Sequence, residues 1–208
     1  KNGGIMKRTI AMVLVALVGS GPAWADAPPT IEKLLEVNPR IYIGGSVGMT
    51  TLDTRITNLT GTAELDEDDF GIKYYGGVRI NRIFGLEAHY ADLGRRSLSG
   101  NPGDRFNSGG RTLQFIRSAT ITTDEVSYGL AATAGFDISE RFRPFAKFGG
   151  HRWSQEGRTS TSNTSTTIYG IDFFFGVGVQ AEVFKGLSVR AEFERFHFDG
   201  SDYVNFFS

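Results

Sequence analysis

The chain has 208 residues, with 22 Lys and Arg against 23 Asp and Glu, which gives a formal net charge of −1. It contains no Cys, so a disulfide framework, a Cys-ligated zinc site and a thiol nucleophile are excluded. Because Lys and Arg are not in excess, we expect no nucleic-acid partner. The chain is long enough for one domain, and it pairs 27 Gly with 17 Phe in a sequence only 40% hydrophobic.

The N-terminal segment has the pattern of a secretory signal peptide. Basic residues after Met6 precede an apolar run at 10–18, a Gly-Pro breaker follows at 21–22, and an Ala-x-Ala site lies at Ala23 and Ala25. A transmembrane anchor is the alternative, but the run is shorter than the roughly 20 apolar residues of a spanning helix. We therefore predict export with cleavage after Ala25, which leaves a mildly acidic mature chain.

The sequence divides into three parts. Residues 1–25 hold a few upstream residues and the signal peptide, and 26–40 contain several prolines and a short helix pattern at 30–36. We interpret 26–40 as a periplasmic extension, with a plug helix inside the third part as the alternative. The third part, 41–208, is predicted to be all β.

Seven runs in this third part alternate apolar with small or polar residues, the period of a strand that has two different faces. They cover 41–51, 70–80, 84–90, 126–136, 142–153, 169–183 and 187–194. No apolar run is long enough for a membrane helix, but a barrel wall needs only such half-apolar strands. Trp153 interrupts the alternation of the fifth run, for which we predict a bulge at Gly149 and Gly150.

The connections alternate in length. Tight turns are predicted near Asn81, Ser139 and Lys185, whereas 53–69, 94–122 and 157–166 are long segments rich in Gly, Ser, Thr, Asn and Asp. Short turns at one rim and long loops at the other are typical of an outer-membrane barrel. Aromatic residues at the strand ends are expected near the two membrane interfaces: Tyr42, Tyr90, Phe136, Trp153 and Tyr169.

The motifs resemble, in order, the OmpA-like transmembrane domain, in the family of small outer-membrane barrels that includes opacity-type surface proteins. They are Tyr-Ile-Gly-Gly-Ser-Val-Gly at 42–48, Tyr-Gly-Gly-Val at 75–78, Gly-Leu-Glu at 85–87 with Tyr90, Phe-Gly-Gly-x-x-Trp at 148–153, Phe-Gly-Val-Gly-Val at 175–179 and Val-Arg-Ala-Glu-Phe at 189–193. The resemblance implies an eight-stranded antiparallel up-and-down transmembrane β-barrel in the bacterial outer membrane. It also implies contact with outer-membrane lipid, lipopolysaccharide and the outer-membrane assembly machinery.

The eighth strand is incomplete in the sequence pattern. The segment 203–208 looks like its beginning, truncated several residues short of the usual aromatic end, so we expect the natural chain to continue past Ser208. An even number of strands is needed for closure, because an open edge in lipid leaves unpaired N–H and C=O groups.

The inward face of the predicted strands gathers charged side chains. From these we predict a lumen charge network of seven residues: Lys73, Arg79, Glu87, Lys147, Glu182, Arg190 and Glu192. Glu194 lies on the same face outside this network. Because an eight-stranded barrel is just filled by its own side chains, we expect a filled polar lumen. The alternative is a low-conductance gated ion channel in which Glu87, Lys147, Arg190 and Glu192 exchange partners.

Two other patterns resemble those of enzymes. Gly176-x-Gly178-x-x-Ala181 imitates a dinucleotide fingerprint but lacks the following helix. The three histidines, His89, His151 and His197, are candidate bases for an outer-membrane enzyme that modifies lipid A, which is a further alternative. We predict no catalytic residue, no cofactor and no resident metal.

One loop carries a run of four acidic residues, which suggests a cation-binding loop that would bridge lipopolysaccharide phosphates; the alternative is a solvated loop. Its residues are Asp66, Glu67, Asp68 and Asp69. Exposed loops on a rigid scaffold commonly carry binding functions. We therefore expect a monomeric surface protein that serves in adhesion, in envelope integrity or as a surface antigen, with host or environmental ligands as partners.

Overall fold

The computed structural model describes residues 17–19, 30–53, 56–108, 110–139, 141–161, 165–198 and 202–208. Ala23 and Ala25, the predicted cleavage site, lie outside the described residues. No helix within the described part of the chain is both long and apolar enough to cross a membrane.

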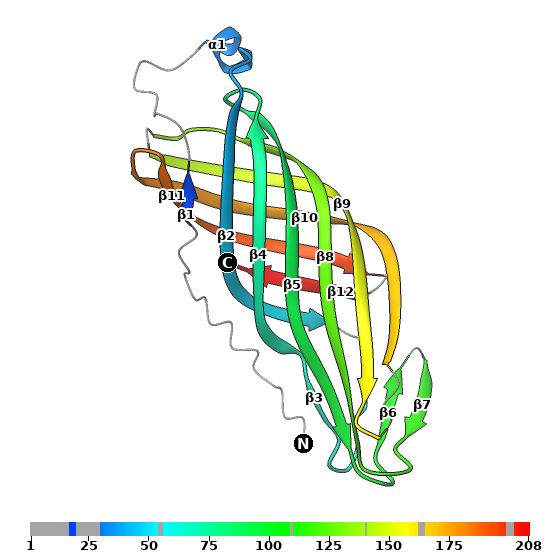
Figure 1. Ribbon diagram of the computed structural model, residues 1–208. Helices are drawn as coiled ribbons and strands as arrows, with labels where there is room; N and C mark the ends of the chain where they lie inside the picture. The colour runs from blue at the N-terminus through cyan, green and yellow to red at the C-terminus, as the bar shows by residue number, and fades with distance from the viewer. Residues whose placement is uncertain are drawn as a thin grey trace.

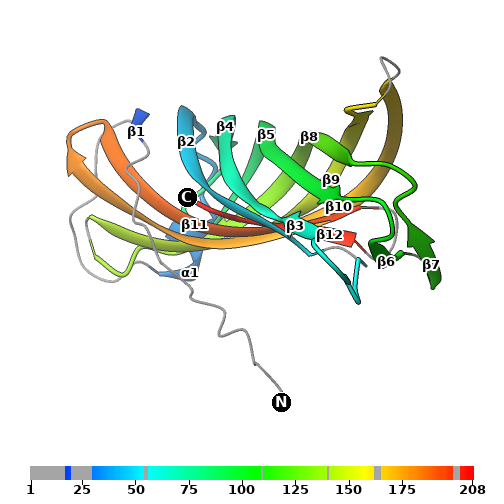
Figure 2. The same cartoon turned by 90° about the horizontal axis from the view of Figure 1, so that it is seen from below.

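Eight antiparallel strands form a closed ring. Each strand pairs with the next along the chain, and the last, β12, pairs with both β11 and β2. Figure 1 shows these strands side by side, and Figure 2 shows the curvature of the wall. The ring consists of β2 (Arg40–Asp53), β4 (Asp68–Arg79), β5 (Phe84–Gly100), β8 (Ala119–Gly135), β9 (Phe142–Thr159), β10 (Ser165–Phe184), β11 (Leu187–Phe198) and β12 (Asp202–Phe207). The fold is the predicted eight-stranded up-and-down barrel.

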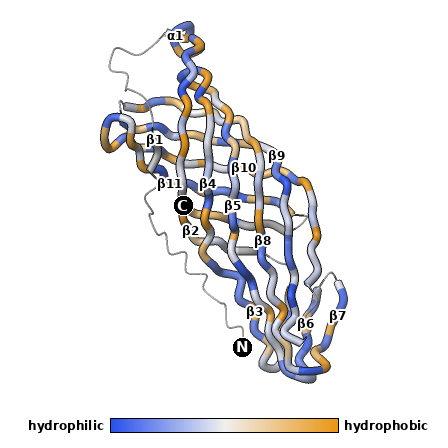
Figure 3. Tube along the Cα trace, in the orientation of Figure 1, coloured by the Kyte–Doolittle hydropathy of each residue, from blue (hydrophilic) through white to orange (hydrophobic). Residues whose placement is uncertain are grey.

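Residues alternate along each strand between the outside of the barrel and its lumen. In β5 the side chains of Phe84, Leu86 and Tyr90 are exposed, whereas Glu87 and His89 are buried. The same period appears in Figure 3 as alternating hydrophobic and hydrophilic residues along the strands. The apolar outer face suits lipid, and the polar inner face forms the core.

The two ends of the barrel differ. The turns that follow β4, β8 and β10 are short, and they mark the periplasmic end. At the other end β5, β8, β9 and β10 have 17, 17, 18 and 20 residues. A tilted strand needs about 9–11 residues to cross a membrane, so these strands project beyond the extracellular surface. Figure 1 shows that β5, β8 and β9 extend well past the end of β2.

The predicted long loops contain strands of their own. β3 (Glu64–Asp66) pairs with the distal part of β5, and β6 (Arg105–Ser108) pairs with β7 (Arg111–Gln114) in a separate hairpin. The described part of 94–122 is therefore mostly strand, whereas in 53–69 the strand residues are 53, 64–66 and 68–69.

The N-terminal helix lies outside the barrel. α1 (Ile31–Leu35) has no buried residue and is placed beyond the periplasmic end in Figure 1. The alternative of a plug helix is therefore wrong. Within the predicted leader, β1 (Leu17–Gly19) pairs with β2 and β11 on the periplasmic side of β12.

Two details of the sequence prediction are wrong. The pairing of β9 with both neighbours continues without interruption through Gly149 and Gly150, so no bulge is present there. Trp153 is instead in phase with Lys147 and is 4% exposed inside the lumen. Tyr42 also points inward, where its hydroxyl donates to Glu87. Neither ring belongs to an interface belt.

Candidate functional site

Six charged side chains meet in the lumen of the barrel. They occupy inward positions on four strands, and each is at most 5% exposed. The group, called the charge cluster below, comprises Lys73 on β4, Glu87 on β5, Lys147 on β9, and Arg190, Glu192 and Glu194 on β11. Three positive groups face three negative ones, so the cluster is neutral in sum.

Each cation of the charge cluster contacts more than one carboxylate. Lys147 Nζ lies 2.9 Å from Glu87, 2.7 Å from Glu192 and 2.5 Å from Glu194. Arg190 reaches Glu87 at 2.6 Å and Glu192 at 3.0 Å. Lys73 contacts Glu192 at 2.8 Å and also Glu194. Buried charges are tolerated when they are paired in this way, whereas removal of one partner leaves an uncompensated charge.

Aromatic side chains surround the cluster on its periplasmic side. The guanidinium of Arg190 lies 4.6 Å from the ring centroid of Tyr75 and 4.1 Å from that of Phe145. The Tyr42 hydroxyl donates to Glu87 over 3.1 Å. These contacts hold Arg190 and Glu87 in one arrangement, because ring faces attract cations and the hydroxyl uses a carboxylate lone pair.

Two residues of the predicted network lie elsewhere. Arg79 and Glu182 are near the periplasmic end of their strands, and Glu182 accepts from the Gly186 backbone N–H. A separate pair occupies this end, where Arg143 donates to Asp137 over 3.1 Å. Glu194 takes part in the charge cluster instead, although the sequence analysis placed it outside the network.

A second layer closes the lumen on the extracellular side of the charge cluster. We call it the aromatic layer; its members are 6% exposed or less and comprise His89, Ser127, His151, Trp153, Phe174, Phe196 and Phe198. Phe174 and Phe196 stack at 5.2 Å, and His89 meets the Phe174 ring edge-on at 4.6 Å. The phenylalanines were missed in the sequence analysis, although the period of two that places Glu194 inward continues to Phe196 and Phe198.

Hydrogen bonds fix the two histidines of this layer. His151 Nε2 lies 2.9 Å from the carbonyl oxygen of His197, which can only accept, so the proton is on Nε2. His151 Nδ1 therefore accepts from the Ser127 hydroxyl at 2.9 Å. The Ser127 oxygen in turn accepts from His89 Nε2 at 3.2 Å. The serine and imidazole are thus adjacent as in a hydrolase, but Ser127 is 0% exposed, and the histidines that bond it contact the rings of Phe174 and Phe196.

Outside the membrane the projecting strands enclose a small apolar core. Leu98, Phe106 and Phe115 are buried there, with Ile56, Leu59, Leu65, Ala119 and Ile121 packed against them. We call β3, β6, β7 and the distal ends of β5 and β8 the extracellular platform. Such a core gives the platform a defined shape.

Asp104 ties two segments of the platform together. Its carboxylate accepts from the backbone N–H of Asn101 at 2.8 Å, from the Thr62 hydroxyl at 2.8 Å and from the Thr62 backbone N–H at 3.2 Å. These hydrogen bonds hold the pKa of the Asp104 carboxyl below its ordinary value, because they stabilise the charged carboxylate. The bond from the Asn101 backbone has the largest effect.

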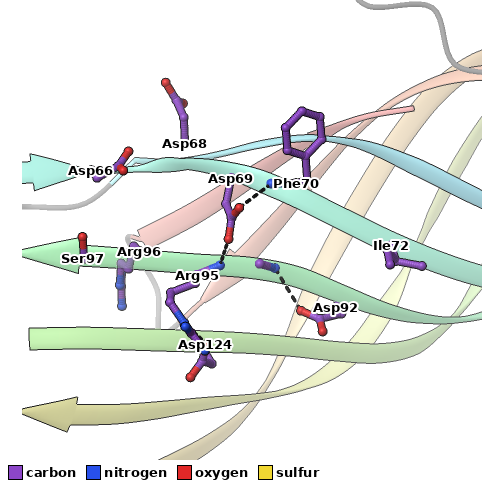
Figure 4. Close-up of a pocket in the computed structure, with 11 residues that line it drawn as sticks. Asp66, Asp68, Asp69, Phe70, Ile72, Asp92, Arg95, Arg96, Ser97 and Asp124 are labelled. Carbon is purple, nitrogen blue, oxygen red and sulfur yellow. Dashed lines mark hydrogen bonds and ion pairs between the residues drawn. The ribbon is translucent and has the colours of Figure 1, made fainter.

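Three residues of the acidic run, Asp66, Asp68 and Asp69, line a pocket of about 520 Å³ beside β4 and β5 (Figure 4), and Glu67 is not among its lining residues. Asp69 accepts from the backbone N–H of Phe70 at 2.8 Å and from that of Arg95 at 2.6 Å. The Arg95 guanidinium bonds Asp124 at 2.7 Å. In the described ranges no group of three or more His, Asp or Glu side chains is arranged to hold a metal ion. Cation binding by Asp66, Glu67, Asp68 and Asp69 stays a prediction.

Comparison with known proteins agrees with this architecture. The outer membrane protein beta-barrel domain family matches residues 11–208, and the chain therefore belongs to this family of bacterial outer-membrane proteins. It is 22% identical over 190 residues to outer membrane protein A of Escherichia coli O157:H7, covering 91% of this chain and 47% of that protein. The chain thus spans about half the length of that curated relative.

Two solved structures of Ail, the attachment invasion locus protein of Yersinia pestis, are also similar. One, in complex with the heparin analogue sucrose octasulfate, is 13% identical with a TM-score of 0.49, covering 94% of this chain and 95% of that chain. The other is 18% identical with a TM-score of 0.44, covering 79% and 92%.

Proposed function

We propose that this protein is a surface-interaction barrel that binds host or environmental surfaces through its extracellular platform, and that its lumen serves as a rigid closed support. The observation that carries the proposal is the contrast between the two ends of the wall. The strands continue past the membrane and enclose the core of Leu98, Phe106 and Phe115, whereas the lumen is filled by paired charges and stacked rings. Binding residues commonly lie on segments held by such a scaffold.

A channel through the lumen is the competing function. The charge cluster favours it in one respect, because Glu87 contacts both Lys147 and Arg190, the two partners that gating would exchange. The aromatic layer argues against it, since an ion would have to pass Phe174, Phe196 and Phe198, which are 0%, 0% and 1% exposed. The interior of an eight-stranded barrel is only wide enough to hold its own side chains.

Attachment of cells that display the protein tests the proposal. We compare wild type with Phe106→Ser/Phe115→Ser, which breaks the platform core, and with Phe106→Leu/Phe115→Leu as the matched control. Cells are applied to immobilised serum proteins and to a eukaryotic cell monolayer. Wild type and the leucine variant should attach, and the serine variant should not, while all three keep heat-modifiable gel mobility as a sign of an intact barrel.

Equal attachment of the serine variant would overturn the proposal. So would a change of lipid A mass on expression, which would instead support an outer-membrane enzyme. The mass measurement is made on the same cells, so that binding and catalysis are read in one experiment.

A further inference from the structure

The β6–β7 hairpin of the extracellular platform has two edges that differ. β6 uses its outer edge, because the Asn107 backbone N–H and C=O bond the Thr57 C=O and N–H at 2.7 and 3.0 Å. One residue pair further on, the Arg105 carbonyl accepts from the Thr60 N–H at 2.9 Å. The β6 edge is thus covered by the segment that precedes β3.

β7 presents the corresponding groups to solvent. In an antiparallel pair the residues alternate between those bonded to the partner strand and those whose N–H and C=O point away. Asn107 is opposite Thr112 and Arg105 is opposite Gln114. Since Asn107 and Arg105 direct their backbone groups away from β7, Thr112 and Gln114 direct theirs away from β6. Among the described residues only β6 pairs with β7, and all four β7 residues are exposed. In Figures 1 and 2, β7 is the outer strand of the hairpin.

The charge around this edge is positive. Within the described part of the chain, the guanidinium groups of Arg105, Arg111 and Arg117 make no ion pair or hydrogen bond. The nearby carboxylate, Asp104, is already occupied by Asn101 and Thr62. Two large apolar side chains, Leu113 and Ile116, are 45% and 85% exposed beside the arginines.

We infer that the free edge of β7 binds an extended acidic segment of a partner protein by strand addition. Main-chain bonds at Thr112 and Gln114 supply affinity, and the positive charge of Arg105, Arg111 and Arg117 selects a segment that carries carboxylates. A second copy of β7 offers the arginines no carboxylate, because Arg111–Gln114 contains no acidic residue. An anionic glycan would use the arginines but has no need of a strand edge. The inference rests on the proposed surface-binding function and names its partner class.

The test uses the full chain refolded in detergent micelles and a fluorescent peptide that alternates Glu with Val. Two comparison ligands are used: the same peptide with N-methyl groups on alternate amides, and a sulfated oligosaccharide. Gln114→Pro removes an outward N–H that the hairpin does not use, and Gln114→Ala is the matched control that keeps it. Arg111→Gln/Arg117→Gln removes charge and keeps the edge.

We expect the Glu-Val peptide to bind wild type and Gln114→Ala equally. Gln114→Pro should bind it roughly tenfold more weakly, and N-methylation should have a similar effect, because each removes main-chain hydrogen bonds. Arg111→Gln/Arg117→Gln should also weaken binding. If the N-methylated peptide binds as well as the parent, or if only the oligosaccharide binds, strand addition is wrong. Such a result combined with attachment that still depends on the platform core would remove this inference and leave the proposed function standing.

Discussion

Lys147 Nζ and Glu87 Oε1 lie 2.9 Å apart although their strands, β9 and β5, are separated in the sheet by β8. The contact is therefore made inside the lumen and not between neighbours in the wall. It joins sides of the barrel that backbone pairing does not connect directly. The ion pairs of the charge cluster thus connect non-adjacent strands across a lumen that is filled by side chains.

Removal of Lys147 should destabilise the barrel. Lys147→Met leaves three carboxylates facing two cations, and breaking a buried ion pair in this way costs about 3–5 kcal/mol. Urea unfolding of the refolded chain in lipid vesicles measures the difference. Lys147→Met/Glu194→Gln restores neutrality and should recover part of the loss. An unchanged midpoint for the single variant would mean that the cluster is not held as described.

Trp153 should behave as a lumen residue. In a chain without residues 1–25 it is the single tryptophan, since the sequence has two and the other is Trp24. Brominated lipids should quench its fluorescence weakly, because Trp153 is 4% exposed inside the barrel. The matched control is Phe173→Trp in a Trp153→Phe background, where the new ring replaces a side chain that is 43% exposed. Equally strong quenching of both proteins would place Trp153 on the lipid face.

Much of the wall was predictable, because alternation is a local property of each strand. The same period would also have placed Trp153 inward, but the usual position of aromatic residues at membrane interfaces suggested an outward ring. Gly170 on the neighbouring strand leaves space for the inward ring of Trp153, because a Cβ at position 170 would lie 2.2 Å from Trp153 Cζ2. Space for the ring thus depends on a residue far along the chain.

The extracellular platform was not predictable from local patterns. β3, β6 and β7 have three or four residues each, too few to show a period. Their order depends on contacts such as that of Asp104 with Thr62, which are 42 residues apart. The charge cluster was predictable in part. Alternation shows that its side chains point into the lumen. Their position along the barrel axis, which separates Arg79 and Glu182 from the cluster, depends on strand register.

Acid should loosen the platform through Asp104. Its folded-state pKa is lowered, so the carboxylate contributes stability above its ordinary pKa, and this contribution is lost as the pH falls through that value towards the folded pKa. Hydrogen exchange of the Asn101 and Thr62 amides, followed as the pH falls, measures the loss. Asp104→Asn should show fast exchange already at neutral pH. Exchange that is equally slow in wild type and variant at both ends of the range would exclude this role.

Processing should remove the leader together with β1. We predict that N-terminal sequencing of protein recovered from the outer membrane begins at Asp26, and that Ala25→Arg retains the leader. Because β12 itself closes the ring on β2 and β11, the processed chain should keep its heat-modifiable mobility. Loss of that mobility on removal of 1–25 would show that Leu17–Gly19 is a necessary part of the wall.

The division between a closed lumen and a binding platform is tested most directly by single-channel recording of the refolded wild-type chain in a planar lipid bilayer. With the charge cluster paired and the aromatic layer above it, we predict a membrane current indistinguishable from that of protein-free bilayers. Discrete conductance steps that change when Glu87→Gln or Arg190→Gln is introduced would contradict the account and assign the lumen to ion transport.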